Sequence, residues 1–129
     1  MKIKKVLYIE DNTTKYMAVN RYLGKQKLST LDWAKKAEEA IEMIEVAIKE
    51  GAPYDLIVSD MHFDFFGEDD HDAGEKVMKL LREKGINTPI IFCSSQNWII
   101  PGAVGNIYYN PYRDWEIEAD ELFKKLKEI

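Results

Sequence analysis

The chain has one cysteine, four prolines, no excess of positive charge and no long hydrophobic run. The single cysteine, Cys93, cannot form an internal disulfide, which fits a reduced, cytoplasmic environment. A net charge of -5 provides no basic face for nucleic acid or for an anionic lipid surface. The first apolar run stops at Glu10 and is too short for a signal peptide, and no window approaches a membrane span. We therefore expect a cytoplasmic protein that binds neither nucleic acid nor membrane directly.

Short apolar runs alternate with longer amphipathic stretches along the 129 residues, a rhythm that predicts βα units and a parallel sheet. The length suits one domain over residues 1–129. Strands are predicted over residues 3–9, 28–33, 54–59, 90–93 and 107–109, and helices over 13–23, 34–50, 73–84 and 114–128. Residues 60–72 are expected to form an acidic, aromatic loop. Residues 98–105 hold at most a turn or two of helix, because Pro101 and Gly102 interrupt them.

Polar side chains follow the predicted strands where each strand ends. Glu10 and Asp11 follow the first, Asp60 the third, Ser94 the fourth and Asn110 the fifth. Ligands bind at the carboxyl ends of strands in an open parallel sheet, so these side chains should converge on one crevice. Two carboxylates at roughly 4 Å repel by about 4 kcal/mol at an effective dielectric near 20, so the cluster raises a pKa or recruits a cation. Hard oxygen ligands suit Mg²⁺ or Mn²⁺, and the Ser94 hydroxyl suits a phosphoryl oxygen.

Five segments, in this order, give the chain a family resemblance: VLYIEDN, YDLIVSDM, DAGEKVMKLLR, TPIIFCSS and YYNPY. Over nearly its whole length the chain resembles the receiver domains of two-component response regulators. The resemblance implies an α/β, flavodoxin-like fold. That fold is a doubly wound, five-stranded parallel sheet of order 2-1-3-4-5 with helices on both faces, here with a shortened fourth helix.

The resemblance also implies roles for the residues at the strand ends. Asp60 would accept a phosphoryl group from a histidine kinase or a phosphotransfer protein. Asp11, Asp60 and the backbone carbonyl of His62 would hold the Mg²⁺, with Glu10 helping through water. Ser94 would donate a hydrogen bond to the phosphoryl oxygens. Such a domain promotes its own phosphorylation and dephosphorylation but is not an enzyme in the usual sense.

The sequence departs from the family at the end of the fifth strand, where Asn110 stands in place of a lysine. A charge-assisted hydrogen bond contributes roughly 1.5–3 kcal/mol, against about 0.5–1.5 for a neutral amide. We expect this to weaken the coupling between phosphorylation and conformational switching without preventing phosphorylation. Arg113 lies close in sequence, either as a replacement cation or as a surface arginine.

The segment 61–72 is longer than is usual for the family and leaves two alternatives open. Its histidines and acidic residues form either a second metal site or a solvated acidic loop, and their spacing fits no EF-hand or zinc pattern. Phe63, Phe65 and Phe66 either fold back onto the core or form a surface for a partner.

We consider three alternative functions for this sequence. The first is a stand-alone phosphoacceptor in a phosphorelay, whose signal leaves by binding a downstream protein or by dimerisation. The alternative is a degenerate receiver that acts as a phosphorylation-independent interaction module. The third, an aspartyl-phosphate phosphatase of the haloacid dehalogenase type, requires a second aspartate two positions after Asp60, where this chain has His62. No Gly-Lys-Ser/Thr loop and no Gly-Xaa-Ser-Xaa-Gly elbow supports another enzyme class.

Overall fold

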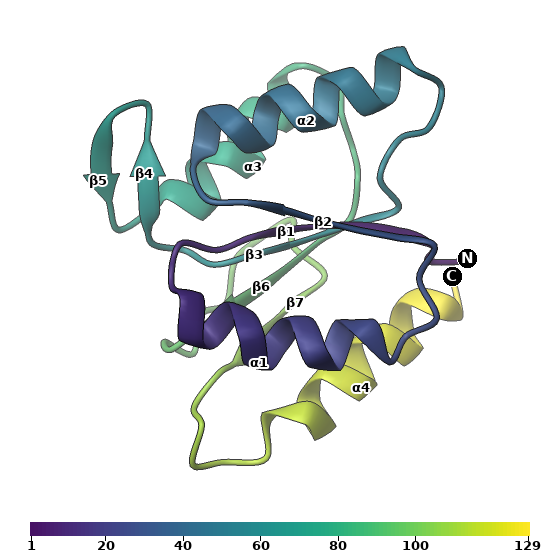
Figure 1. The fold of residues 1–129 in the computed structure, drawn as a ribbon, viewed down its shortest axis with the longest axis vertical. Coiled ribbons are helices and arrows are strands. Elements are labelled where there is room, and N and C mark those ends of the chain that lie inside the picture. Colours follow the sequence, from purple (N-terminus) through teal and green to yellow (C-terminus); the bar gives the residue numbers. More distant parts are fainter.

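The computed structural model describes residues 1–129 and places a five-stranded parallel sheet between two layers of helices (Figure 1). The strands of this sheet are β1 (Lys5–Ile9), β2 (Thr30–Ala34), β3 (Leu56–Ser59), β6 (Ile90–Ser94) and β7 (Gly105–Tyr108). The helices are α1 (Thr13–Gly24), α2 (Ala37–Lys49), α3 (Ala73–Glu83) and α4 (Trp115–Lys127), and none combines the length and hydropathy needed to cross a bilayer. The sheet order β2-β1-β3-β6-β7 confirms the predicted 2-1-3-4-5 topology.

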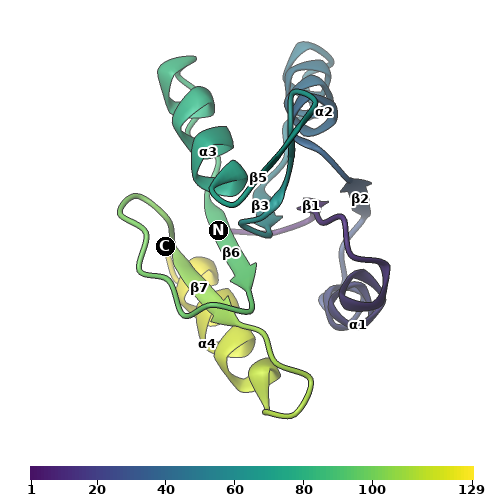
Figure 2. The ribbon, with the colours of Figure 1, turned by 90° about the vertical axis from the view of Figure 1, so that its left-hand side faces the viewer.

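Helices cover both faces of the sheet, with α2 and α3 on one side and α1 and α4 on the other (Figures 1 and 2). The alternation of side chains along β1 divides the core accordingly. Leu7 and Ile9 pack with α2 and α3, whereas Val6 and Tyr8 pack with α1 and α4. Both faces of the central strands are therefore buried, which explains their continuous apolar sequences.

The register of the strands brings their carboxyl ends to one edge of the sheet. Ile9 lies opposite Ser59, and Ser59 lies opposite Phe92. The amide of Asp60 donates to the carbonyl of Ile9 at 2.9 Å, so the residue after β3 is fixed beside the residues after β1. The fold itself thus creates the crevice that the sequence predicted.

The segment after β3 contains a β-hairpin, so the prediction of an acidic, aromatic loop throughout residues 60–72 was wrong. Strands β4 (Phe63–Phe65) and β5 (Glu68–Asp70) pair antiparallel around a two-residue turn. Phe66 and Gly67 both have positive φ, 53° and 94°, as this turn requires. The aromatic residues divide between the two alternatives: Phe63 is fully buried against α2 and α3, Phe65 is partly buried beside it, and Phe66 is 55% exposed.

The segment between β6 and β7 forms turns, and the short helix expected within residues 98–105 is absent. Pro101 has no N–H to donate, and Gly102 has a φ of 92°, which no α-helix accommodates. Ile100 and Ala103 nevertheless pack against the α2 and α3 core, so this side of the sheet is covered without a helix.

Gly74, in the first turn of α3, is expected to tolerate no side chain. An added Cβ would lie 2.4 Å from the carbonyl oxygen of Asp60 and 3.1 Å from the Cα of Met61. Either the start of α3 or the backbone after β3 would therefore have to shift. We expect Gly74→Ala to lower the free energy of unfolding by about 1–3 kcal/mol, measured by urea unfolding followed by circular dichroism. Gly24→Ala at the end of α1 is the control, because no atom lies within 4 Å of its added Cβ. Equal unfolding midpoints for the two variants would contradict the close approach.

Candidate functional site

Three acidic residues meet where β1 and β3 end. Glu10, Asp11 and Asp60 each place one carboxylate oxygen within 4.8 Å of the others. They differ in burial: Glu10 is fully buried, Asp60 is partly buried and Asp11 is exposed. The structure therefore brings together the three carboxylates that the sequence placed at one crevice.

Glu10 lies beneath the site and faces the interior. Its Oε1 accepts a hydrogen bond from the Tyr8 hydroxyl at 2.9 Å, and its Oε2 accepts one from the Asn12 amide at 3.2 Å. Burial is the main cause that raises the pKa of Glu10 well above its ordinary value, and the nearby Asp60 acts in the same direction, whereas Lys15 opposes the shift. Its backbone carbonyl accepts from the Trp33 indole at 2.8 Å. Glu10 is thus held rigidly and lies outside the lining of the cavity above it.

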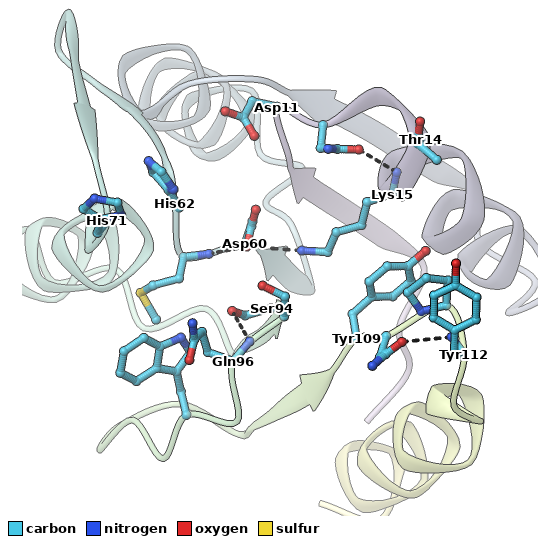
Figure 3. A pocket seen from close by; sticks show the side chains of 16 residues that line it. Asp11, Thr14, Lys15, Asp60, His62, His71, Ser94, Gln96, Tyr109 and Tyr112 are labelled. Atoms are coloured by element: carbon cyan, nitrogen blue, oxygen red, sulfur yellow. Dashed lines mark hydrogen bonds and ion pairs between the residues drawn. The ribbon is translucent and has the colours of Figure 1, made fainter.

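Asp11 and Asp60 line an open cavity of about 790 Å³ at the carboxyl edge of the sheet (Figure 3). Asp60 Oδ1 accepts a hydrogen bond from the Met61 amide at 2.8 Å, which fixes the orientation of the carboxylate. Partial desolvation, followed by repulsion from Asp60, raises the pKa of Asp11 above its ordinary value. These are the two carboxylates that a ligand entering the cavity can reach.

Lys15 also belongs to the site, and it was not among the residues predicted from the sequence. Its side chain reaches from the first turn of α1 toward Asp60 (Figure 3), and only 11% of it is exposed. The ammonium Nζ lies 3.0 Å from Glu10 Oε1 and 3.2 Å from Asp60 Oδ1, and it donates to the carbonyl of Cys93 at 2.5 Å. The one sequence signal was its position, four residues after Asp11 in a helix that begins at the site.

Ser94 and Asn110 lie on the cavity wall opposite the acidic residues, as the sequence predicted. Ser94 is 3% exposed, and its hydroxyl oxygen accepts from the Gln96 amide at 3.1 Å, which leaves the hydroxyl proton free to donate. The side-chain oxygen of Asn110 accepts from the Tyr112 amide at 2.9 Å and so stabilises the turn around Pro111. Arg113 binds Tyr108 and Glu118 outside the cavity lining, so it does not replace the missing lysine.

Two histidines form the rim next to the hairpin. His62 Nε2 lies 2.8 Å from Asp69 Oδ2, a hydrogen bond that raises the pKa of this imidazole. The His62 and His71 ring centroids are 4.3 Å apart. No cluster other than Glu10, Asp11 and Asp60 brings three ligand atoms of histidine, cysteine or carboxylates together, so the structure supports no second metal site in the hairpin.

No protein-family model matches the chain, and no curated protein matches its sequence. Solved structures do match its fold. The receiver domain of a Francisella response regulator is 20% identical, with a TM-score of 0.69 over 97% of this chain and 98% of that one. The Thermotoga maritima response regulator TrrA, crystallised with Mg²⁺ and a beryllium fluoride, is 21% identical, with a TM-score of 0.68 over 96% and 99%.

The receiver domain of the Arabidopsis thaliana histidine kinase CKI1, also crystallised with Mg²⁺ and BeF₃⁻, is 18% identical, with a TM-score of 0.65 over 98% of this chain and 91% of that chain. The chain therefore has the flavodoxin-like fold of response-regulator receiver domains, as the sequence predicted.

The raised pKa of Asp11, caused first by partial desolvation and then by repulsion from Asp60, predicts an effect on stability. Because the pKa of Asp11 is raised on folding, its ionisation lowers the free energy of unfolding as the pH rises from the ordinary carboxyl range through the raised pKa. In metal-free buffer we expect Asp11→Asn to be more stable than the wild type at about pH 7, by up to about 1 kcal/mol because solvent screens this exposed group. The gain should vanish at about pH 3, where the wild-type carboxyl is protonated.

Urea unfolding at the two pH values measures this difference, with chelator present throughout. Glu121→Gln on α4 makes the same change of charge at an exposed position outside the cavity and serves as the control. A gain of the same size in both variants would attribute the effect to net charge and not to the cluster.

Proposed function

We propose that this chain is a response-regulator receiver domain that accepts a phosphoryl group on Asp60 in a Mg²⁺-dependent phosphorelay. The donor would be the phosphohistidine of a histidine kinase or of a phosphotransfer protein. The observation that carries the proposal is the arrangement of the cavity. Asp60 stands at the end of the central strand β3, with the Asp11 carboxylate on one side and the Ser94 hydroxyl on the other (Figure 3).

The residues present fit a divalent cation with oxygen ligands. Asp11 and Asp60 present carboxylates to the cavity, and their two negative charges lie close enough together to be compensated by one cation. These two side chains, with the His62 carbonyl, would hold Mg²⁺, and Mn²⁺ is the second candidate. The cation would neutralise charge on the transferring group. Glu10 contributes its charge from below, since its oxygens already bind Tyr8 and Asn12.

The transfer requires a free carboxylate oxygen and a donor on the opposite side. Asp60 Oδ1 is held by Met61 and Lys15, so Oδ2 is the oxygen without a protein hydrogen bond. Attack by this oxygen forms the new P–O bond while the P–N bond of the phosphohistidine breaks, and the imidazole nitrogen keeps the electron pair. The Ser94 hydroxyl can donate to a phosphoryl oxygen, and the rest of the catalysis is positioning and charge neutralisation.

Two observations favour a second candidate function, a phosphorylation-independent interaction module. A neutral amide, Asn110, stands at the lysine position of the family, and turns replace a helix between β6 and β7. The two functions make opposite predictions about Asp60. A phosphoacceptor loses its modification when this one carboxylate is removed, whereas an interaction module is never modified.

Mg²⁺ binding can be measured from tryptophan fluorescence, because the site has its own reporter. The Trp33 indole donates to the Glu10 carbonyl and stacks on Tyr16 with ring centroids 3.6 Å apart. We expect Mg²⁺ to change the emission and Asp60→Asn to weaken binding at least about tenfold, equivalent to about 1.4 kcal/mol. Glu68→Gln in the hairpin, exposed and outside the cavity, should bind Mg²⁺ like the wild type. Unchanged affinity in Asp60→Asn would exclude this carboxylate as a ligand.

Phosphorylation itself is tested by intact mass after incubation with Mg²⁺ and acetyl phosphate. We expect one added phosphoryl group on the wild type and on Glu68→Gln, and none on Asp60→Asn. Ser94→Ala should be modified more slowly, because one donor to the phosphoryl oxygens is lost. A wild type that binds Mg²⁺ but shows neither an adduct nor a response to beryllofluoride would contradict the phosphorelay and leave the interaction module.

A further inference from the structure

Lys15 is the only lysine or arginine that lines the cavity. Its three ammonium hydrogens match three acceptors at short range: Glu10 Oε1, Asp60 Oδ1 and the carbonyl of Cys93. These acceptors belong to the ends of β1, β3 and β6, so one side chain from α1 contacts all three strand ends that border the phosphoacceptor. A solvated surface lysine has no such set of partners.

The local sequence holds Lys15 in this direction. Asn12 caps α1 and accepts a hydrogen bond from the Lys15 amide at 2.9 Å, which fixes the backbone of the first turn above the site. The ammonium also lies 5.7 Å from the centre of the Tyr109 ring, a cation–π contact on the cavity wall. Burial by itself lowers the pKa of this ammonium, but the neighbouring Cys93, Glu10 and Asp60 outweigh that effect and raise it.

Position 110, where the family has a lysine, provides no positive charge to the cavity. Asn110 is neutral, and its side-chain oxygen is used by the Tyr112 amide. Arg113 is bound to Tyr108 and Glu118. A phosphoryl group on Asp60 would therefore meet one permanent positive charge from the protein, and that charge comes from α1.

We infer that Lys15 is the cation that binds and positions the phosphoryl group on Asp60, acting from α1 in place of a lysine at position 110. The inference rests on the proposed phosphorylation of Asp60. When Asp60 becomes an acyl phosphate, its carboxylate charge is lost and the phosphoryl oxygens carry the negative charge instead. The ammonium lies 3.2 Å from Asp60 Oδ1, and rotation about the bonds of the flexible lysine side chain can bring it to the phosphoryl oxygens.

The same geometry gives Lys15 a second effect, on the metal. Before phosphorylation the ammonium neutralises Glu10 and Asp60, and so opposes a divalent cation at the same cluster. Removal of its charge should therefore strengthen Mg²⁺ binding while it slows phosphorylation. A variant whose structure is merely damaged would show slower phosphorylation and weaker Mg²⁺ binding. Opposite changes in these two quantities therefore distinguish a positioning role of Lys15 from a structural one.

The experiment compares phosphorylation rates and Mg²⁺ affinities of Lys15→Met, which keeps the aliphatic stem, with those of the wild type. With acetyl phosphate and saturating Mg²⁺, intact mass should show a rate at least about tenfold lower for Lys15→Met, with Mg²⁺ affinity by tryptophan fluorescence equal or higher. The double variant Lys15→Met, Asn110→Lys should recover several-fold of the lost rate, because it returns a cation from the other side of the cavity. Arg21→Met, exposed on the same helix, should match the wild type.

The outcomes separate this inference from the function on which it rests. A wild-type adduct with an equal rate in Lys15→Met overturns the role of Lys15 and leaves phosphorylation of Asp60 intact. A slow Lys15→Met that also binds Mg²⁺ more weakly, with no recovery in the double variant, overturns it in favour of a structural role. No adduct on the wild type overturns the proposed function first, and the role of Lys15 with it.

Discussion

The site depends on compensation of the negative charge of Glu10, a fully buried carboxylate. Two hydrogen bonds and the Lys15 ammonium compensate it, and an unpaired charge at this depth would cost several kcal/mol. Because Lys15 is shared with Asp60, the same ion pair links the interior to the cavity. Any ligand that changes the charge on Asp60 therefore also changes the balance around Glu10. The sheet provides the geometry of the site, and the shared Lys15 ammonium couples the charge of Asp60 to that of Glu10.

The central sheet was predictable because each of its strands reads as a short apolar run and each amphipathic helix separates two of them. The same reasoning placed Glu10, Asp11, Asp60 and Ser94 at one edge, since polar residues directly after parallel strands must converge there. These inferences need only local sequence and the rules of parallel sheets. They did not depend on how any side chain is oriented.

Features that depend on the orientation of side chains and of the turn backbone could not be predicted from the sequence. Lys15 was overlooked because a lysine on an amphipathic helix usually faces solvent, and only the placement of α1 above the strand ends turns it into the cavity. The hairpin was overlooked for another reason. Its turn begins with Phe66, an aromatic residue at positive φ, whereas the usual signal for such a turn is Asn-Gly or Asp-Gly. Gly67 was the remaining clue, and burial of Phe63 supplies the energy that the turn sequence lacks.

The turns between β6 and β7 have a further consequence, for the kinetics of amide hydrogen exchange. Between Ser95 and Val104 only the amides of Gln96, Ala103 and Val104 donate to protein acceptors. A helix in this position would have protected most of the amides between Ser95 and Val104 from exchange, and its opening would have been cooperative. Here the backbone that carries Trp98 along the cavity wall can exchange by small local openings while β6, directly beside it, stays closed. The wall next to Ser94 is therefore the part of the site that can change shape at the least cost to the fold.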